Sequence, residues 1–128
     1  MTGRRTGKIL AVEATEQEAR RLRVLLETLG RSVRLAMSPD EALRLLRREI
    51  LQEAVVAIEL ACGGRPLLAH LAALPAITRL VAIGPAGDVR LEEAARRGGA
   101  GAYLSRPVKL DALAAAIHET SPIAPRPP

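Results

Sequence analysis

Residues 55–60 read VVAIEL, a continuous and β-rich apolar run that is interrupted only by the acid at its end. Such a run is typical of a central parallel strand, which is buried on both faces and therefore lacks polar alternation. Glu59 breaks the pattern, because a buried strand rarely ends in an acid by accident. We therefore predict a strand over Val55 to Leu60 that delivers Glu59 to its carboxyl end.

A second apolar strand with the same ending lies earlier in the chain. Residues 8–12 read KILAV and are followed at once by Glu13. Further strands are predicted from Ser32 to Ala36, where alternation indicates a position near a sheet edge, from Arg79 to Ile83, and at Tyr103-Leu104.

Helix signals separate these strands. Thr15 with Glu18, and Ser38 with Glu41, form capping boxes before apolar residues at helical spacing, and Asp88 can cap a third helix that runs to about Arg97. A short helix is predicted around Pro66 to Ala73, and a last one holds Leu110, Leu113, Ala114 and Ile117. Strand and helix alternate five times, which predicts one α/β domain: a doubly wound, five-stranded parallel sheet with five helices.

Composition limits the possible functions. Residues 1–120 form one predicted domain. Residues 121–128 read SPIAPRPP and form a proline-rich tail or a linker to another domain. The one cysteine excludes an intramolecular disulfide, and no signal peptide or membrane-spanning run is apparent, so we expect a cytoplasmic protein.

The formal net charge of +5 raises the question of a nucleic-acid partner. Most arginines lie among glutamates on several predicted helices, as on solvated helix faces. The small cluster of Arg4, Arg5 and Lys8 has no stacking aromatics beside it. We therefore expect no direct nucleic-acid binding and no membrane binding, and a monomer or weak dimer.

In a doubly wound sheet, ligands bind at the carboxyl ends of the strands, near the point where the strand order reverses. Glu13, Glu59 and Arg106 follow three of the predicted strands, and Arg106 is part of the run Tyr-Leu-Ser-Arg-Pro. These residues are the candidates for a functional site.

With these residues in this order, the chain from Lys8 to His118 resembles the receiver domain of two-component response regulators, which has the flavodoxin-like fold. The resemblance implies a metal-binding acid pair at Glu13 and Ala14, and a phosphoacceptor at Glu59. It also implies a hydroxyl residue at Gly84 and a lysine at Arg106, with Pro107 retained.

Most of these positions depart from the family pattern. Ala14 has no carboxylate, Glu59 stands in place of aspartate, Gly84 has no hydroxyl, and Arg106 replaces lysine. Magnesium prefers near-octahedral oxygen ligands, so Glu13 and Glu59 are only weak residual candidates and we expect weak or absent magnesium binding and no other cofactor. Phosphoryl transfer relies on positioning and charge neutralisation, and should be slow here.

The resemblance also assigns Tyr103 as the switch aromatic. In the family, the hydroxyl residue and this aromatic move together when phosphate binds, and Gly84 cannot take part. Tyr103 is therefore either an interaction residue for a partner or simply a packed side chain.

We hypothesise that the Arg106 guanidinium pairs with Glu59 or Glu13 and holds the site closed. The alternative is an ion pair that only balances charge after the site lost its role. The resulting prediction is a non-enzymatic, degenerate receiver, a pseudo-receiver that acts by protein-protein interaction with a histidine kinase or an output protein. Two alternatives remain: a receiver that takes phosphate from a histidine kinase with magnesium, and a regulatory domain with an output domain after residue 128.

Overall fold

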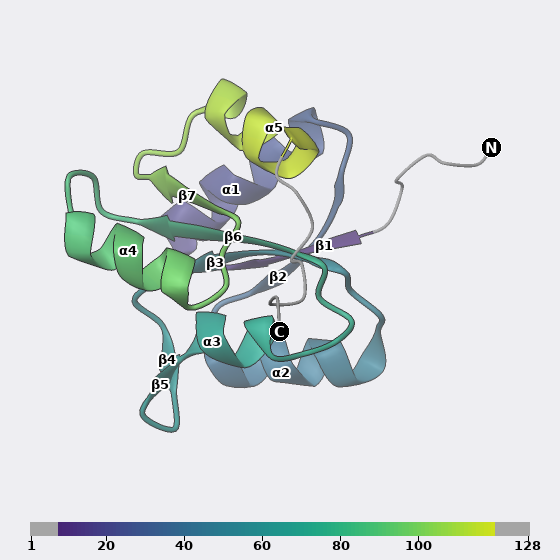
Figure 1. Ribbon diagram of the computed structural model, residues 1–128. Coiled ribbons are helices and arrows are strands. Elements are labelled where there is room, and N and C mark those ends of the chain that lie inside the picture. The colour runs from purple at the N-terminus through teal and green to yellow at the C-terminus, as the bar shows by residue number, and fades with distance from the viewer. Residues whose placement is uncertain (1–7, 120–128) are drawn as a thin grey trace.

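A computed structural model describes residues 8–119, and its centre is one parallel β-sheet (Figure 1). The five strands are arranged in the order β2-β1-β3-β6-β7. Their bounds are β1 Lys8–Val12, β2 Ser32–Ala36, β3 Glu53–Ala57, β6 Arg79–Gly84 and β7 Ala102–Ser105. The predicted doubly wound, flavodoxin-like fold is confirmed, including the edge position of β2.

Within the described residues, five helices are present, and they cover the two faces of this sheet (Figure 1). Their bounds are α1 Glu16–Thr28, α2 Pro39–Arg48, α3 Leu67–Ala72, α4 Val89–Arg97 and α5 Leu110–Glu119. One core cluster joins α1 and α5 to the sheet residues Ile9, Val55 and Val81, and the other joins α2, α3 and α4 to Leu10, Val56 and Ala82. The side chains of successive strand residues thus point to opposite faces of the sheet, as in any pleated strand.

The predicted helix starts are present as side-chain caps. The Glu18 amide donates to Thr15 Oγ1 over 3.2 Å, the Glu41 amide donates to Ser38 Oγ over 3.2 Å, and the Leu91 amide donates to the Asp88 carboxylate over 3.1 Å. Each cap satisfies an amide that the first helical turn leaves without a partner.

The region around Glu59 differs from the prediction. Strand β3 covers Glu53–Ala57, so Glu59 lies in a turn two residues beyond the strand. The strand also begins earlier than predicted, because Glu53 is buried beside arginines. Its ion pairs with Arg31 and Arg79 offset the cost of burying its charge.

A small hairpin follows this turn and was not predicted. Strand β4 (Ala61–Cys62) pairs antiparallel with β5 (Arg65–Pro66), and the hairpin projects from the body of the domain (Figure 1). Gly63 and Gly64 make the turn at φ 62° and 81°, a region that residues with a Cβ disfavour. The segment between Glu59 and α3 is thus a tight hairpin.

Some predictions concern other parts of the chain. The basic residues Arg4 and Arg5 and the tail 121–128 lie outside the described residues. Among residues 8–119, no helix is both long and apolar enough to cross a bilayer.

Candidate functional site

The order of the strands brings the candidate residues to one edge of the sheet. Strands β1 and β3 are neighbours, and the chain order reverses between them because β2 lies outside β1 while β6 and β7 lie beyond β3. Glu13 follows β1 directly and Glu59 follows β3. This switch point is where doubly wound sheets bind ligands.

Glu13 is buried at this edge and its backbone is bonded to the neighbouring strand. Its amide donates to the Ala36 carbonyl of β2 over 3.2 Å, and only 2% of the residue is exposed. A carboxylate this far from water needs a charged or hydrogen-bonding partner. The requirement makes the partner of Glu13 the central question of the site.

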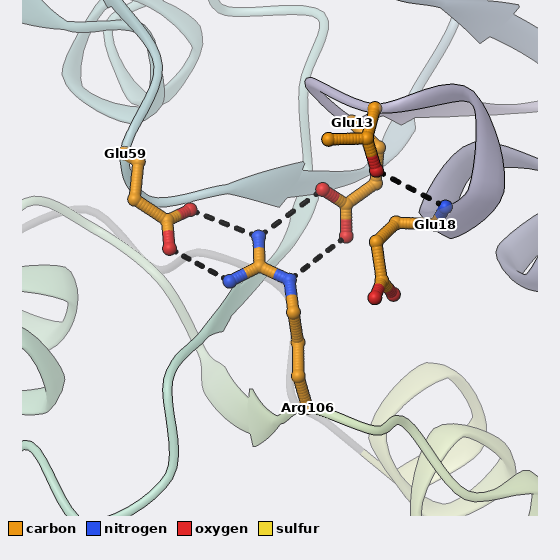
Figure 2. A network of polar contacts seen from close by, with 5 residues as sticks. Glu13, Glu18, Glu59 and Arg106 are labelled. Atoms are coloured by element: carbon orange, nitrogen blue, oxygen red, sulfur yellow. Dashed lines mark hydrogen bonds and ion pairs between the residues drawn. The ribbon is translucent and has the colours of Figure 1, made fainter.

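Arg106 supplies that partner and reaches Glu59 at the same time (Figure 2). Its Nη2 donates to Glu13 Oε1 over 3.1 Å, with a longer contact of 3.4 Å from Nε to Glu13 Oε2. Its Nη1 and Nη2 donate to the two oxygens of Glu59 over 2.7 and 2.9 Å. The guanidinium therefore bridges both carboxylates, and we call these three residues the Arg106 cluster.

The electrostatics of the cluster follow from this geometry. The hydrogen bonds from Arg106 hold the pKa of Glu59 below its ordinary value. Glu59 in turn raises the pKa of Arg106, and Glu13 adds to the effect. Both charged forms are therefore favoured by their contact, although Glu59 remains 45% exposed and the site is open to solvent on its side.

The remaining candidate positions contribute no polar side chain to the site. Ala14 is exposed and offers only a methyl group. Gly84 is buried at the end of β6, and the space beside it is taken by Tyr103, whose hydroxyl donates to the Pro85 carbonyl over 2.9 Å. The structure thus brings Glu13, Glu59 and Arg106 together and places the half-buried side chain of Tyr103 against Gly84.

Comparison with known proteins gives the family. No protein-family model matches the chain, and no curated protein matches it either. Among solved structures, the signal receiver domain of a modulated diguanylate cyclase from Desulfovibrio desulfuricans has a TM-score of 0.77 and 30% identity, with 91% of this chain and 94% of that chain covered.

The chain belongs to the response-regulator receiver domains.

Two further solved structures are similar to this receiver. The signal receiver domain of an HD domain-containing protein from Pseudomonas fluorescens has a TM-score of 0.77 and 26% identity, over 91% of this chain and 94% of that chain. A response regulator receiver domain protein from Clostridium thermocellum has a TM-score of 0.78 and 23% identity, over 89% and 93%, and supports the fold alone.

The oxygen ligands of this receiver do not suit a divalent cation. Both available carboxylates, Glu13 and Glu59, are already bonded to the Arg106 guanidinium, and Ala14 adds no third one. Within residues 8–119 no group of three or more His, Cys, Asp or Glu side chains could hold a metal ion. A cation at this edge would have to compete with a fixed positive charge.

Sequence reasoning missed the closeness of Tyr103 to Gly84. The sequence does carry a signal for it, since a glycine at the end of one strand and a large ring on the next strand can be complementary, but the register between the strands had to be known. Figure 2 also draws the cap at the start of α1, in which the Glu18 amide donates to Thr15 Oγ1.

Proposed function

We propose that this receiver is a degenerate one, a pseudo-receiver that acts in signal transduction by binding a partner protein and is not phosphorylated at Glu59. The observation that carries the proposal is the Arg106 cluster, in which one guanidinium bonds both oxygens of Glu59 and the buried Glu13. A bidentate, charge-assisted pair of this kind is among the stronger polar interactions in proteins.

The chemistry of phosphoryl transfer explains why this cluster opposes it. The attacking oxygen must approach phosphorus in line, while cations neutralise the charge that spreads over the transferred group. Here each Glu59 oxygen already accepts a hydrogen bond from Arg106, and the pair would have to break before either oxygen could attack. Gly84 offers no hydroxyl and Ala14 no metal ligand in compensation.

The partner in this proposal is another signalling protein, such as a histidine kinase or an output protein, in the cytoplasm. The receiver itself performs no catalysis, binds no nucleic acid directly, and is a monomer or weak dimer. Solved neighbours are described as receiver domains of an HD domain-containing protein and of a diguanylate cyclase, which supports a second possibility. In that version the receiver regulates an output domain within a longer chain.

The test is intact-protein mass spectrometry after incubation with a small-molecule phosphodonor and magnesium. The matched control is a variant with Glu59→Asp, Ala14→Asp, Gly84→Thr and Arg106→Lys, which restores each group that the family pattern expects. We expect no adduct on the natural chain and a phosphoryl adduct on the restored variant. An adduct on the natural chain, lost in Glu59→Gln, would show a phosphorylatable receiver and overturn the proposal.

A further inference from the structure

Gly84 ends β6, and the side chain of Tyr103 reaches it from the neighbouring strand β7. Strands β6 and β7 are parallel, with Ala82 opposite Tyr103 and Gly84 opposite Ser105. The ring of Tyr103 extends from its own strand to the end of β6, where its hydroxyl donates to Pro85. The side chain therefore spans two positions along the neighbouring strand.

The space that a side chain at position 84 would need is occupied by this ring. A Cβ atom added at Gly84 would lie 2.2 Å from Tyr103 Oη, 2.9 Å from Tyr103 Cζ and 2.7 Å from Ile58 Cγ2. Separations below 3.0 Å are essentially never seen for real Cβ atoms. Only glycine at position 84 is thus compatible with Tyr103 in this position. Serine and threonine are excluded like every other residue with a Cβ atom.

The backbone gives no other reason for a glycine here. The described glycines with positive φ are Gly30, Gly63, Gly64, Gly87 and Gly99, and Gly84 is not among them. An ordinary strand conformation accepts any residue, so the steric requirement comes from Tyr103 and Ile58.

Tyr103 is held in place by both packing and polar contacts. The half-buried ring packs against the core cluster that contains Ile58, Ala82 and Ala95, and its hydroxyl has the Pro85 carbonyl as acceptor. Burial raises the pKa of Tyr103, and the charges of Asp88 and Glu59 add to the effect. The neutral phenol is therefore the favoured form.

We propose that Gly84 provides a fixed seat for Tyr103, so that the surface formed by α4 and β7 keeps one form whatever happens at Glu59. This inference rests on the proposed function, in which the receiver signals through its surface, and it adds how that surface is regulated. A family member with a hydroxyl residue at this position can couple it to the aromatic. Here the Tyr103 ring occupies the space that a side chain at position 84 would fill, so the surface that a partner binds does not switch.

The sequence makes this proposal directly measurable. Tyr103 is the one tyrosine and the chain has no tryptophan or phenylalanine, so intrinsic fluorescence reports on this ring alone. For the natural chain at neutral pH we expect fluorescence that is protected from acrylamide, and phenol absorbance that titrates above the ordinary pKa of about 10. Quenching as efficient as that of free tyrosine would overturn the proposal.

Gly84→Ser is the decisive substitution, because its side chain needs the space that the ring fills. We expect the Tyr103 ring to move out, acrylamide quenching to rise toward that of free tyrosine, and the pKa of the phenol to shift down toward about 10. Gly98→Ala is the matched control: its Cβ would contact Ala94 and Leu68 at 3.2 and 3.4 Å and does not involve Tyr103. Unchanged quenching in Gly84→Ser would contradict the proposal.

A second pair of variants covers the case in which Gly84→Ser does not fold. Gly84→Ala combined with Tyr103→Ala should recover most of the stability that Gly84→Ala loses, because the main obstacle has been removed. Recovery with Ile58→Ala instead of Tyr103→Ala would assign the steric conflict to Ile58 and refute the seat for Tyr103.

The failure of this inference can be told apart from failure of the proposed function. A phosphoryl adduct on Glu59 with unchanged Tyr103 quenching would refute the function but leave the fixed ring intact. A freely quenched Tyr103 without an adduct would refute the fixed ring alone. Arg106→Lys alters the Arg106 cluster only and should leave the acrylamide quenching of Tyr103 fluorescence unchanged.

Discussion

Arg106 bonds two carboxylates that lie in very different environments, and a lysine at this position could not make the same set of bonds. Glu13 is buried while Glu59 is about half exposed, so the bridging group must satisfy a desolvated acid and a solvated one together. The guanidinium has five donors in a rigid planar fork, whereas an ammonium group has three on a single nitrogen. One lysine nitrogen cannot occupy all three donor positions that Arg106 uses.

Arg106→Lys should therefore destabilise the domain. We expect the free energy of unfolding to fall by about 1–3 kcal/mol, because the buried Glu13 loses hydrogen bonds that water cannot replace. Urea denaturation followed by circular dichroism measures the change. Arg20→Lys is the control, since Arg20 pairs with Glu16 on the exposed face of α1 and the loss there should stay below about 0.5 kcal/mol. Equal losses for both variants would show that the cluster contributes no more than a surface pair.

The pairing of Glu59 should depend on pH in a defined direction. Its pKa is lowered in the folded state, so the pair stabilises the domain above the ordinary glutamate value of about 4.3, and this contribution is lost as the pH falls through the lowered pKa. Glu59→Gln should cost about 0.5 kcal/mol near neutral pH, a small amount because Glu59 is half exposed. Denaturant titrations of both proteins should differ at neutral pH and converge in acid. A difference that grows in acid would contradict the assignment.

At the scale of elements, the helix starts are local devices that sequence spacing specifies. Ser38→Ala should remove the acceptor for the Glu41 amide at the start of α2 and lower the free energy of unfolding by about 1 kcal/mol. Ser38→Asp is the control, because aspartate retains an acceptor and suits the helix dipole. Thermal denaturation should rank the natural chain and Ser38→Asp together and above Ser38→Ala; equal midpoints for all three would mean that the cap does not stabilise α2.

The start of β3 depends instead on distant residues. Glu53 is buried between Arg31, which precedes β2, and Arg79, which begins β6 and donates through Nη1 to the Ile117 carbonyl of α5 over 2.9 Å. The ion pairs connect β3 with the strands and helix around it. Their contribution to the free energy of unfolding is tested by removing the negative charge of Glu53.

Glu53→Gln should lower the free energy of unfolding by about 3 kcal/mol, because the ion pairs of Glu53 with the buried Arg31 and Arg79 lose their negative charge. Chemical denaturation gives the value, and Glu27→Gln on the exposed part of α1, next to Arg23, is the matched control with little expected effect. A change below about 1 kcal/mol would show that water compensates these arginines and that the burial of Glu53 has little consequence.

At the scale of the whole molecule, magnesium binding should be visible as a change in stability. A cation that binds the folded state alone raises stability as RT ln(1 + [L]/Kd). Because Arg106 already occupies both carboxylates, we expect millimolar magnesium to leave the melting temperature of the natural chain unchanged. The restored variant used in the phosphorylation test should gain several degrees under the same conditions. A magnesium-dependent rise in the melting temperature of the natural chain that Glu13→Gln abolishes would refute the conclusion that Arg106 keeps a cation from Glu13 and Glu59.

Much of the architecture was predictable because it depends on local patterns. Caps at Thr15, Ser38 and Asp88 mark helix starts, and uninterrupted apolar runs mark buried parallel strands. The end of β3 was less predictable, because Ile58 is apolar and continues the run although the chain already turns there. The hairpin at Gly63 and Gly64 was missed because two-residue strands carry no periodicity of their own.

The candidate site divides in a similar way. The residue types Glu13, Glu59 and Arg106 and their places after strands were evident from the sequence, because the order of apolar runs determines which residues reach the carboxyl edge. Whether Arg106 would bond one carboxylate, both or neither was decided only by the tertiary structure, because this depends on how the edge strand β7 is placed across the sheet from β1. The burial of Glu53 and the contact of Tyr103 with Gly84 are likewise tertiary, since each joins residues from different strands and their energies depend on register and on exclusion of water, which no local pattern contains.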